Sequence, residues 1–380
     1  MSVLVVPSWY SIGRGQVGAF FREQALALQK NGVDVIVADA TLKARGASLS
    51  NQFRTLCIDD EGLRTYSHTT PSFGGWRFPR LGVMLFRRNL EKIYKKLVAD
   101  GIKIDLIHAH SYFPAGAAVK QLSEKYGIPY VLTEHSGNVI SGNLDAARKK
   151  ILKQCVDSSA ATICVSKALK TKLVELTETN KDIQVIPNMV NTEMFSASVC
   201  STSPFRFISI GNLIQSKRFD LTLRAFASAF SDNMDVALTI VGDGVLRKDL
   251  EALTEELGIS KQVEFVGRVD RAEVVKQLQR SNAFVLASDF ETFGVVYIEA
   301  LACGLPVIGT KNGGADDIIT DDCGRLVDTN DAEQLSCAMG SLYSEYETLD
   351  KDRLSVNCRE RFGEVAVCKA IQEVYKNICI

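Results

Sequence analysis

Hydrophobic residues along this chain fall into short continuous runs, separated by segments in which they recur at helical spacing. Runs such as Val3–Val6 and Val33–Ala38 are typical of strands buried on both faces of a sheet. Between them, Phe20–Gln29 has the period of a helix, and Gly32 follows as a stop. A strand, a helix and a strand in this order predict a parallel sheet that is covered by helices.

The same alternation continues through the chain. Further strands are expected at Asp105–Ala109, Ile128–Thr133, Ala161–Ser166, Phe205–Ile210, Val236–Val241, Val263–Val266, Phe284–Ala287 and Pro306–Thr310. Helices are expected at Val83–Val98, Ala115–Tyr126, Asp220–Phe230, Val295–Cys303 and Phe362–Ile378. Thr41–Phe78 shows no sustained period and is expected to be loop with short strands, and Ser and Thr cluster in a predicted linker at Phe195–Pro204. With 380 residues, the sequence predicts an α/β protein of two domains.

One stretch, Phe284–Gly314, combines several features of a ligand site. A buried strand leads into a loop, and Thr292 offers its hydroxyl oxygen as the cap of the helix Val295–Cys303. Gly304 and Pro306 then end that helix. The loop and the start of the helix therefore lie where ligands collect in α/β proteins.

Two carboxylates, Glu291 and Glu299, bracket the start of this helix, so both can face one ligand. The backbone N–H groups of Thr292, Phe293 and Gly294 lie at the positive end of the helix dipole, which suits a diphosphate. A carboxylate accepts hydrogen bonds from two neighbouring hydroxyl groups of a sugar or a ribose. These features predict a nucleotide-sugar site, and a helix with two solvated glutamates is the simpler but poorer alternative.

The segment also resembles a known signature. It reads SDFETFGVVYIEALACGLPVIGT and is similar to the signature of retaining glycosyltransferases of family 4, with Glu291 and Glu299 at the two glutamate positions and Gly304 and Pro306 at the glycine-proline step. The resemblance implies the GT-B fold, in which two facing Rossmann-like domains with parallel sheets are joined by a C-terminal helix that crosses back to the first domain. The ranges expected are 1–195 for the acceptor domain, 196–360 for the nucleotide-sugar domain and 361–380 for the returning helix.

The glycines near the N-terminus allow two interpretations. Gly13, Gly15 and Gly18 form a G-x-G-x-x-G pattern, with Asp39 further along the chain, as in dinucleotide-binding proteins. In that fingerprint, however, the first glycine follows the strand almost directly, whereas Pro7–Ile12 intervene here. The region is also similar to the opening of family 4 transferases, whose glycine loop reaches the donor phosphate. Gly15 and Gly18 are therefore donor-binding candidates, with a simple flexible turn as the alternative.

Histidines fall at the carboxyl ends of two expected strands, where ligands gather in a parallel sheet. His110 and His135 can both bond to sugar hydroxyls there, and His108 is expected to be structural. The resemblance implies that His135 lies near the transferred sugar. It assigns no role to Glu134.

The resemblance also implies a donor diphosphate site after the first strand of the second domain. Lys217 matches the family's lysine, but Asn212 stands where many members have an arginine, and Arg218 stands where they have a glycine. Either Arg218 supplies the second charge or the site has one cation. Further along, Arg268 and Val269 match the place where relatives recognise the base, so both are base-binding candidates.

Composition limits the other possibilities. Apolar residues make up 46% and charged residues 23% of the chain, as in ordinary globular proteins. The first residues enter a strand directly, and no apolar run approaches the ~20 residues of a membrane span. A cytoplasmic protein is therefore expected. The ten cysteines include no C-x-x-C pair, so free thiols are expected and a metal site is not. Asp350-Lys351-Asp352 is expected at the surface.

Charge divides the chain. Up to Val190 there are 25 basic and 16 acidic residues, so the remainder holds 44 − 25 = 19 basic and 45 − 16 = 29 acidic residues. A helix face with Arg88, Lys92, Lys95 and Lys96 lies in the basic part. Basic residues attract anionic lipid, which suggests a lipid-linked or envelope acceptor at the inner face of the cell membrane. A solvated basic face is the plainer alternative. Nucleic acid is not expected as a partner.

The sequence thus predicts a metal-independent, retaining hexosyltransferase with no cofactor beyond its UDP- or GDP-linked donor. Lys217, Arg218 and the helix start are expected to stabilise the charge on the departing diphosphate. Two alternatives remain: an epimerase or hydrolase of similar fold, and a non-catalytic nucleotide-sugar-binding partner subunit. Release of a free sugar or an epimer without an acceptor distinguishes the first.

Overall fold

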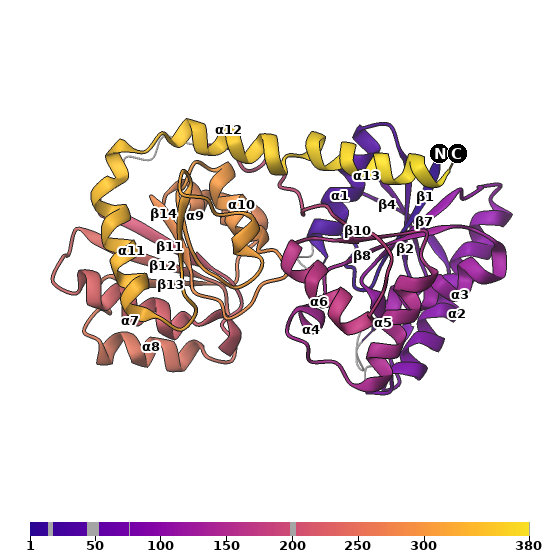
Figure 1. Ribbon diagram of the computed structural model, residues 1–380, viewed down its shortest axis with the longest axis horizontal. Coiled ribbons are helices and arrows are strands. Elements are labelled where there is room, and N and C mark those ends of the chain that lie inside the picture. The colour runs from indigo at the N-terminus through magenta and orange to yellow at the C-terminus, as the bar shows by residue number, and fades with distance from the viewer. Residues whose placement is uncertain (14–17, 44–52, 76, 198–202, 380) are drawn as a thin grey trace. The chain divides into compact units, whose positions relative to one another are not determined.

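The computed structural model describes the chain except for residues 14–17, 44–52, 76, 198–202 and 380, and Figure 1 shows its course. The chain forms two compact units, which are residues 1–187 with 365–380 and residues 188–364. The expected ranges of 1–195, 196–360 and 361–380 follow the same order along the chain. Each unit is an α/β domain built on a parallel sheet, so the predicted fold class is confirmed.

The first unit is built on an eight-stranded sheet with the order β10-β9-β8-β7-β1-β2-β5-β4. All neighbours run parallel except β4, which pairs antiparallel with β5 at one edge. Its strands are β1 (Ser2–Pro7), β2 (Asp34–Asp39), β4 (Leu56–Asp60), β5 (Leu63–Ser67), β7 (Leu106–His110), β8 (Tyr130–Glu134), β9 (Ala161–Cys164) and β10 (Ile183–Val185), and β3 (Leu42–Lys43) pairs separately with β6 (Thr70–Pro71).

Helices cover both faces of this first sheet. In Figure 1, α1 and α13 lie on one side and α2, α3 and α5 on the other. The helices are α1 (Ala19–Lys30), α2 (Pro79–Ala99), α3 (Ala117–Tyr126), α4 (Gly137–Ile140), α5 (Ala146–Ser158), α6 (Lys167–Thr177) and α13 (Glu364–Ile378). Because both faces are covered, the central strands β7 and β8 are buried along their whole length.

Helix α13 returns to the first unit, as the fold prediction requires. The Tyr375 hydroxyl group lies 2.6 Å from Nδ1 of His108, and Gln372 donates a hydrogen bond to the carbonyl of Asn31. The single terminal helix expected at Phe362–Ile378 is wrong at its start, because Gly363 ends one helix and α13 begins after it.

The second unit is built on a fully parallel sheet with the order β13-β12-β11-β14-β15-β16. Its strands are β11 (Phe205–Ile210), β12 (Val236–Val241), β13 (Val263–Gly267), β14 (Ala283–Leu286), β15 (Val307–Thr310) and β16 (Gly324–Val327). Its helices are α7 (Phe219–Phe230), α8 (Arg247–Glu256), α9 (Arg271–Gln279), α10 (Val295–Ala302), α11 (Ala332–Glu345) and α12 (Lys351–Phe362). The strand order reverses between β11 and β14, and ligands bind at such a switch point in open α/β sheets.

No helix of the described residues is both long enough and apolar enough to cross a membrane.

Candidate active site

The switch point of the second sheet brings together loops from distant parts of the sequence. The loop after β11 carries Asn212 and Lys217, and the loop after β14 carries Glu291 and leads into α10. Backbone bonds tie these loops together, since the N–H of Asp289 donates to the carbonyl of Ser216 and the N–H of Glu291 donates to that of Asn312. The residues predicted to hold the donor therefore converge at one edge of the sheet.

Helix α10 starts in an unusual way. The expected cap at Thr292 is wrong: Gly294 occupies the cap position with φ of 92°, and no side chain caps the helix. That left-handed conformation favours glycine. None of the described residues accepts a hydrogen bond from the backbone N–H groups of Thr292, Phe293 and Gly294. The helix start therefore keeps N–H donors for an anion.

A second glycine, Gly314, allows another loop to pack against this helix start. A Cβ added to Gly314 would lie 2.6 Å from the carbonyl oxygen of Phe293, so only glycine fits. Asn312 holds the same loop, because its Oδ1 accepts hydrogen bonds from the N–H groups of Gly314 and Ala315. The loop at Asn312–Ala315 therefore packs closely against the backbone at the start of α10.

Glu291 and Lys217 are in direct contact. Oε1 of Glu291 accepts hydrogen bonds from Nζ of Lys217 and, at 2.9 Å, from the hydroxyl of Ser288. Both side chains are largely buried, with exposed fractions of 11% for Glu291 and 23% for Lys217. The predicted cation and the predicted sugar-binding carboxylate thus form one unit.

Arg218 is engaged differently. Its guanidinium contacts Asp220 at 3.1 Å, Asp289 at 3.2 Å and the side chain of Asn330. The pKa of Arg218 is raised, mainly by its hydrogen bond to Asp220. Its φ of 48° lies in the left-handed region, which accounts for the glycine that related sequences are expected to carry here. Two carboxylates therefore already balance the charge of Arg218, and Asn212 is an exposed neutral residue.

Glu299 lies inside α10 and is 3% exposed. Burial raises the pKa of its carboxyl group, against the opposing effect of Arg271, whose guanidinium donates a 2.8 Å hydrogen bond to Oε1 of Glu299. Arg271 also lies over the ring of Phe195, with its guanidinium carbon 5.0 Å from the ring centre.

The base-binding candidates are close in sequence to this ion pair. Arg268 and Val269 follow β13, and Asp270 then caps α9 by accepting a hydrogen bond from the N–H of Glu273. Arg271 is the first residue of α9, so the candidates lead directly into the helix that contacts Glu299. Arg268 and Val269 are therefore close in the chain to Arg271, which bonds to Glu299, the predicted ribose ligand.

In the first unit, the described candidates gather at the carboxyl end of the sheet. Gly18 precedes α1 with φ of 78°, and a Cβ there would lie 2.8 Å from the carbonyl oxygen of Trp9. The next turn places Phe20 against His135, with ring centres 5.3 Å apart. Gly18 and His135 therefore lie at one edge of this sheet, whereas Gly15 lies outside the described residues.

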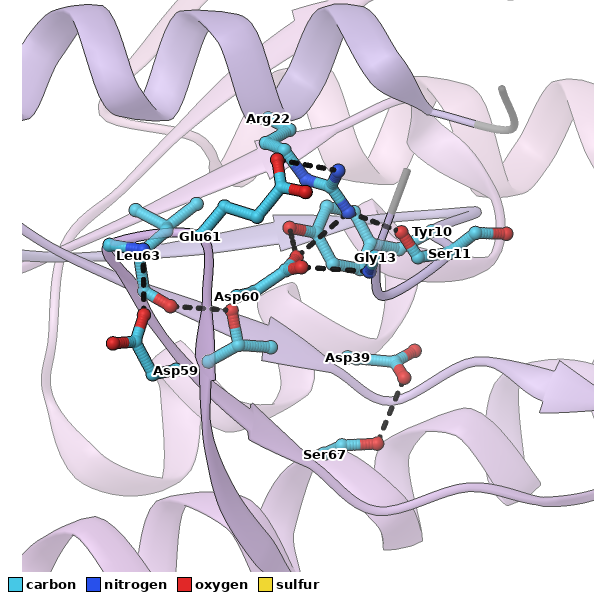
Figure 2. Close-up of polar contacts among 12 residues, drawn as sticks. Tyr10, Ser11, Gly13, Arg22, Asp39, Asp59, Asp60, Glu61, Leu63 and Ser67 are labelled. Carbon is cyan, nitrogen blue, oxygen red and sulfur yellow. Dashed lines mark hydrogen bonds and ion pairs between the residues drawn. The ribbon is translucent and has the colours of Figure 1, made fainter. Parts of the chain in front are cut away.

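A buried polar cluster holds Tyr10–Gly13, the described residues of the loop after β1. Figure 2 shows the carboxylate of Asp60, which accepts hydrogen bonds from the Tyr10 hydroxyl (2.6 Å), the Gly13 N–H (2.8 Å) and the Arg22 guanidinium (2.9 Å). Arg22 also donates to the carbonyl of Ser11. Asp60 is 2% and Arg22 8% exposed, so a buried charge pair fixes this loop to the β4–β5 hairpin.

Asp39 does not support the dinucleotide-binding interpretation, in which its carboxylate would bind a ribose. Figure 2 shows its carboxylate accepting a hydrogen bond from Ser67, and it accepts two more from the N–H and hydroxyl of Thr41. Asp39 is 1% exposed, and its carboxylate already accepts three hydrogen bonds, two from Thr41 and one from Ser67.

Sequence reasoning left Glu134 without a role, yet it is among the most connected side chains at this edge. It is fully buried, and its two oxygens accept hydrogen bonds from the N–H groups of Tyr112, His135 and Ser136. Burial raises the pKa of its carboxyl group to about 7, against these three bonds, which lower it. The signal in the sequence was its position at the carboxyl end of a buried strand.

Among the residues that the structure describes, no group of three or more His, Cys, Asp or Glu side chains is arranged to hold a metal ion. Asp350 of the D-x-D triplet caps α12 by accepting a hydrogen bond from the N–H of Arg353, and the nine described cysteines are free thiols.

Comparison with known families gives matches in both halves of the chain. Residues 17–194 match the family described as Glycosyltransferase Family 4, and residues 190–361 match the family described as Glycosyl transferases group 1. The two matches together span nearly the whole chain.

Individual proteins agree. The N-acetyl-alpha-D-glucosaminyl L-malate synthase of Bacillus anthracis is 30% identical over 295 residues, which cover 74% of this chain and 77% of the relative. A subunit of the phosphatidylinositol N-acetylglucosaminyltransferase of Schizosaccharomyces pombe is 26% identical over 325 residues, covering 83% and 67%. The solved structure of HepE from Anabaena in complex with UDP has a TM-score of 0.76 at 18% identity and covers 99% of this chain and 100% of its own.

Proposed function

The chain belongs to the group 1 glycosyl transferases of family 4, and we propose that it moves a hexosyl group from a nucleoside-diphosphate sugar to an acceptor with retention of anomeric configuration. The observation that carries this proposal is the helix start at Thr292–Gly294, whose unpaired N–H groups lie beside the Lys217–Glu291 pair. A diphosphate needs such a concentration of donors. The neighbour HepE was solved with UDP, which supports a uridine or similar nucleotide.

The chemistry follows from where charge develops. When the bond between the anomeric carbon and the β-phosphate oxygen breaks, the leaving diphosphate gains negative charge. Lys217 and the N–H groups at the start of α10 are fixed before the reaction and stabilise that charge. Because these groups belong to the protein itself, the proposed transfer needs no metal ion.

The two glutamates have separate roles in this proposal. Glu299, buried and oriented by Arg271, accepts hydrogen bonds from the ribose hydroxyls. Glu291 orients Lys217 and accepts a hydrogen bond from a hydroxyl of the transferred sugar. His135 is a further candidate for a hydrogen bond to a sugar hydroxyl. Arg218 contributes less than Lys217, because Asp220 and Asp289 already balance its charge.

We propose a lipid-linked acceptor, but the ion pairs of the structure weaken the argument from the basic helix face. On the predicted basic face, Lys95 lies 3.3 Å from Glu91, Lys96 lies 2.5 Å from Asp100, and Lys92 lies 3.2 Å from Nε2 of His68. The charges of Lys95 and Lys96 are therefore paired with carboxylates, which reduces what these two residues contribute at a membrane.

A groove of about 390 Å³ between α2, α3 and α5 is a second candidate for the contact with an anionic lipid surface. Its lining includes four cationic side chains and no acidic one, around an apolar floor with Val83 and Met84. The cationic residues are Arg80, Arg87, Lys120 and Lys150. Arg87 is paired with Glu91 at 3.4 Å and Lys120 with Glu124 at 2.7 Å, so the proposed contact rests on Arg80 and Lys150. Each basic residue near an anionic bilayer is worth ~1 kcal/mol. The fungal relative is named for a phosphatidylinositol acceptor, which agrees with a lipid substrate.

A panel of UDP- and GDP-linked sugars tests the donor and the stereochemistry. We expect one donor to be consumed, with release of its nucleoside diphosphate, and the new glycosidic bond to keep the donor's anomeric configuration by NMR. EDTA should leave the rate unchanged. An inverted product would refute retention, and release of an epimer or a free sugar at full rate without acceptor would favour the epimerase or hydrolase.

Vesicle co-sedimentation tests the membrane contact. Binding should require anionic lipid, weaken as salt rises, and fall in Arg80→Glu and Lys150→Glu. The matched control is Lys95→Glu, whose lysine is paired with Glu91 and should matter little. Equal binding to neutral vesicles, or equal loss in all three variants, would contradict the groove as the contact.

A further inference from the structure

His135 is held by two neighbours that the proposed chemistry does not use. The first is Glu134, whose Oε1 accepts hydrogen bonds from the N–H of His135 (2.9 Å) and of Ser136 (2.6 Å). Its Oε2 accepts one from the N–H of Tyr112 at 2.8 Å. One carboxylate therefore joins the chain that follows β8 to the chain that follows β7.

The conformation after β7 shows why such a junction is needed. Ser111 has φ of 67°, in the left-handed region that non-glycine residues rarely adopt. Tyr112 follows at once, and its N–H points to Glu134. A buried amide without an acceptor would cost about 1–3 kcal/mol. Glu134 accepts hydrogen bonds from three such amides, so it holds the turn after β7 and the turn after β8 in place.

The second neighbour is His110, which contacts the ring of His135. Nδ1 of His110 lies 3.1 Å from Nε2 of His135, and burial lowers the pKa of both rings, so both are neutral at pH 7. In a neutral pair one nitrogen donates and the other accepts. The hydrogen bond therefore couples the tautomer of His135 to that of His110.

The remaining nitrogen of His135 lacks a partner. Its Nδ1 is buried, and no described residue forms a hydrogen bond with it. Buried polar atoms are nearly always paired in folded proteins, so an unpaired one beside the candidate sugar site fits an atom that pairs with substrate. Phe20 covers the ring with centres 5.3 Å apart, and a sugar hydroxyl that reaches Nδ1 must displace part of this cover.

We propose that Glu134 and His110 are positioning residues for His135, Glu134 by fixing its backbone and His110 by fixing its ring and tautomer, so that Nδ1 meets a hydroxyl of the transferred sugar. This inference rests on the proposed glycosyl transfer and deepens it. Glu134 itself touches no substrate, because its two oxygens are buried and already occupied by three backbone amides.

Titration agrees with this arrangement. A carboxyl group with a pKa of about 7 loses an acceptor position when it is protonated, so the His135 turn should loosen as pH falls below 7. The groups around Glu134 are Tyr112, Cys155 and Cys164, whose pKa values are raised by burial, and the histidines His108, His110 and His135, whose pKa values are lowered by burial. None of these is expected to change its charge between pH 6 and pH 8.

The test uses the full chain and the donor that the panel identifies, with release of its nucleoside diphosphate as the measure of turnover. Glu134→Gln replaces one acceptor oxygen by an amide group and should lower kcat on the order of 10-fold to 100-fold. Binding of UDP or GDP alone should stay at the wild-type level. The rise in kcat between pH 6 and pH 8 should be present in the wild type and flattened in Glu134→Gln. The matched control is Glu175→Gln, an exposed carboxylate paired with Lys172 on α6, which should leave all three unchanged.

A second measurement needs no substrate. The chain has four histidines, so their ring nitrogens can be resolved by ¹⁵N NMR. In the wild type we expect a single tautomer for His135, and in His110→Phe a mixture of tautomers.

Two outcomes separate the possible failures. If His135→Ala keeps full turnover, the sugar-binding role of His135 in the proposed function fails. If His135→Ala loses turnover while Glu134→Gln keeps the wild-type kcat and pH profile, or while His110→Phe keeps a single His135 tautomer, the positioning roles are refuted and the proposed function stands.

Discussion

At the scale of single residues, ion pairs organise the donor site. Glu299 is paired with Arg271, and Glu291 is paired with Lys217, so neither glutamate is the solvated surface residue that isolated glutamates usually are. Buried carboxylates of this kind are expensive unless each oxygen has a partner. A nucleotide can supply the missing donors, since ribose and sugar hydroxyls donate hydrogen bonds.

Glu299→Ala should weaken binding of the free nucleotide. Losing a buried hydrogen-bond partner typically costs ~1–3 kcal/mol, so Kd for UDP or GDP should rise about 5- to 150-fold by calorimetry. Glu273→Ala, at a half-exposed carboxylate on α9 that is paired with Lys276, is the control and should bind as the wild type does. An unchanged Kd in Glu299→Ala would remove Glu299 from the ribose site.

Lys217→Ala should lower kcat much more than Arg218→Ala does. Lys217 is oriented by a single carboxylate beside the helix start, whereas two acidic side chains already balance Arg218. Turnover of the identified donor at saturation measures the difference. A larger loss in Arg218→Ala would instead make Arg218 the main cation of the diphosphate site.

A site residue can be proposed from the sequence when the residues that act with it are close in the chain. Glu291, Gly294 and Glu299 could be proposed together because they lie on one loop and the helix that follows it. Arg271 and Glu134 were not assigned a role, since their importance comes from partners on other elements, such as the turn at Tyr112. Arg218 was expected to hold phosphate, but Asp220 and Asp289 engage it in the fold.

At the scale of elements, the donor site depends on the close packing of loops. Gly314 lies against the backbone of Phe293, and α10 begins at Gly294 rather than at Thr292. A side chain could not be accommodated at either glycine without moving the helix start. The sequence pattern predicted the helix and its end, but the cap was missed because a left-handed glycine replaces the usual side-chain oxygen.

Gly314→Ala should therefore weaken nucleotide binding, because its Cβ would displace the loop or the amides of Thr292–Gly294. The loss should be visible in Kd for UDP or GDP, with little change in secondary structure by circular dichroism. Gly340→Ala on α11 is the matched control: a Cβ there meets nothing within 4 Å, and it should bind normally. Normal binding by Gly314→Ala would show that this loop does not shape the site.

The returning helix α13 is held by a polar contact as well as by apolar packing. Tyr375 bonds to His108, whose other nitrogen lies 2.7 Å from the hydroxyl of Thr133. Tyr375→Phe leaves a buried nitrogen unpaired and should cost about 1–3 kcal/mol in urea unfolding. The control is Tyr343→Phe, because the Tyr343 ring packs on Phe205 and Phe230 while its hydroxyl forms no hydrogen bond with the described residues. Equal effects of the two changes would contradict the role of the Tyr375 hydroxyl.

At the scale of the whole molecule, the histidines make stability depend on pH. Burial lowers the pKa of all four, to about 4 for His68 and about 3 for His108 and His135. The unfolded chain therefore binds more protons below its histidine pKa of about 6.5, and the free energy of unfolding falls as pH is lowered from there. Glu134 acts in the opposite direction: its contribution is present below pH 4.5 and is lost as pH rises through 7.

Four histidines outweigh one carboxyl group, so we expect urea unfolding to show lower stability at pH 5 than at pH 7. His68→Gln removes one titrating group outside the candidate site and should reduce that difference by up to about 1.4 kcal/mol per pH unit. An equal or steeper pH dependence in His68→Gln would contradict the assignment of His68 as a buried neutral ring.

The overall architecture was predictable because apolar runs and helical periods recur through the chain, and the glutamate signature indicated the family. The split of charge between the halves was real, but on the predicted basic face Lys95 and Lys96 are paired with the carboxylates of Glu91 and Asp100. A count of charges along the sequence does not show which lysines form ion pairs with carboxylates four residues away or on another element. The groove between α2, α3 and α5 likewise needed the fold to bring three helices together.

The central claim is that a nucleoside diphosphate binds at the start of α10. A crystal structure of the chain with UDP or GDP, whichever the panel selects, tests it most directly. We expect the diphosphate oxygens within hydrogen-bond distance of the N–H groups of Thr292–Gly294 and of Lys217, with the ribose on Glu299. A nucleotide bound with its diphosphate away from this helix start would contradict the account.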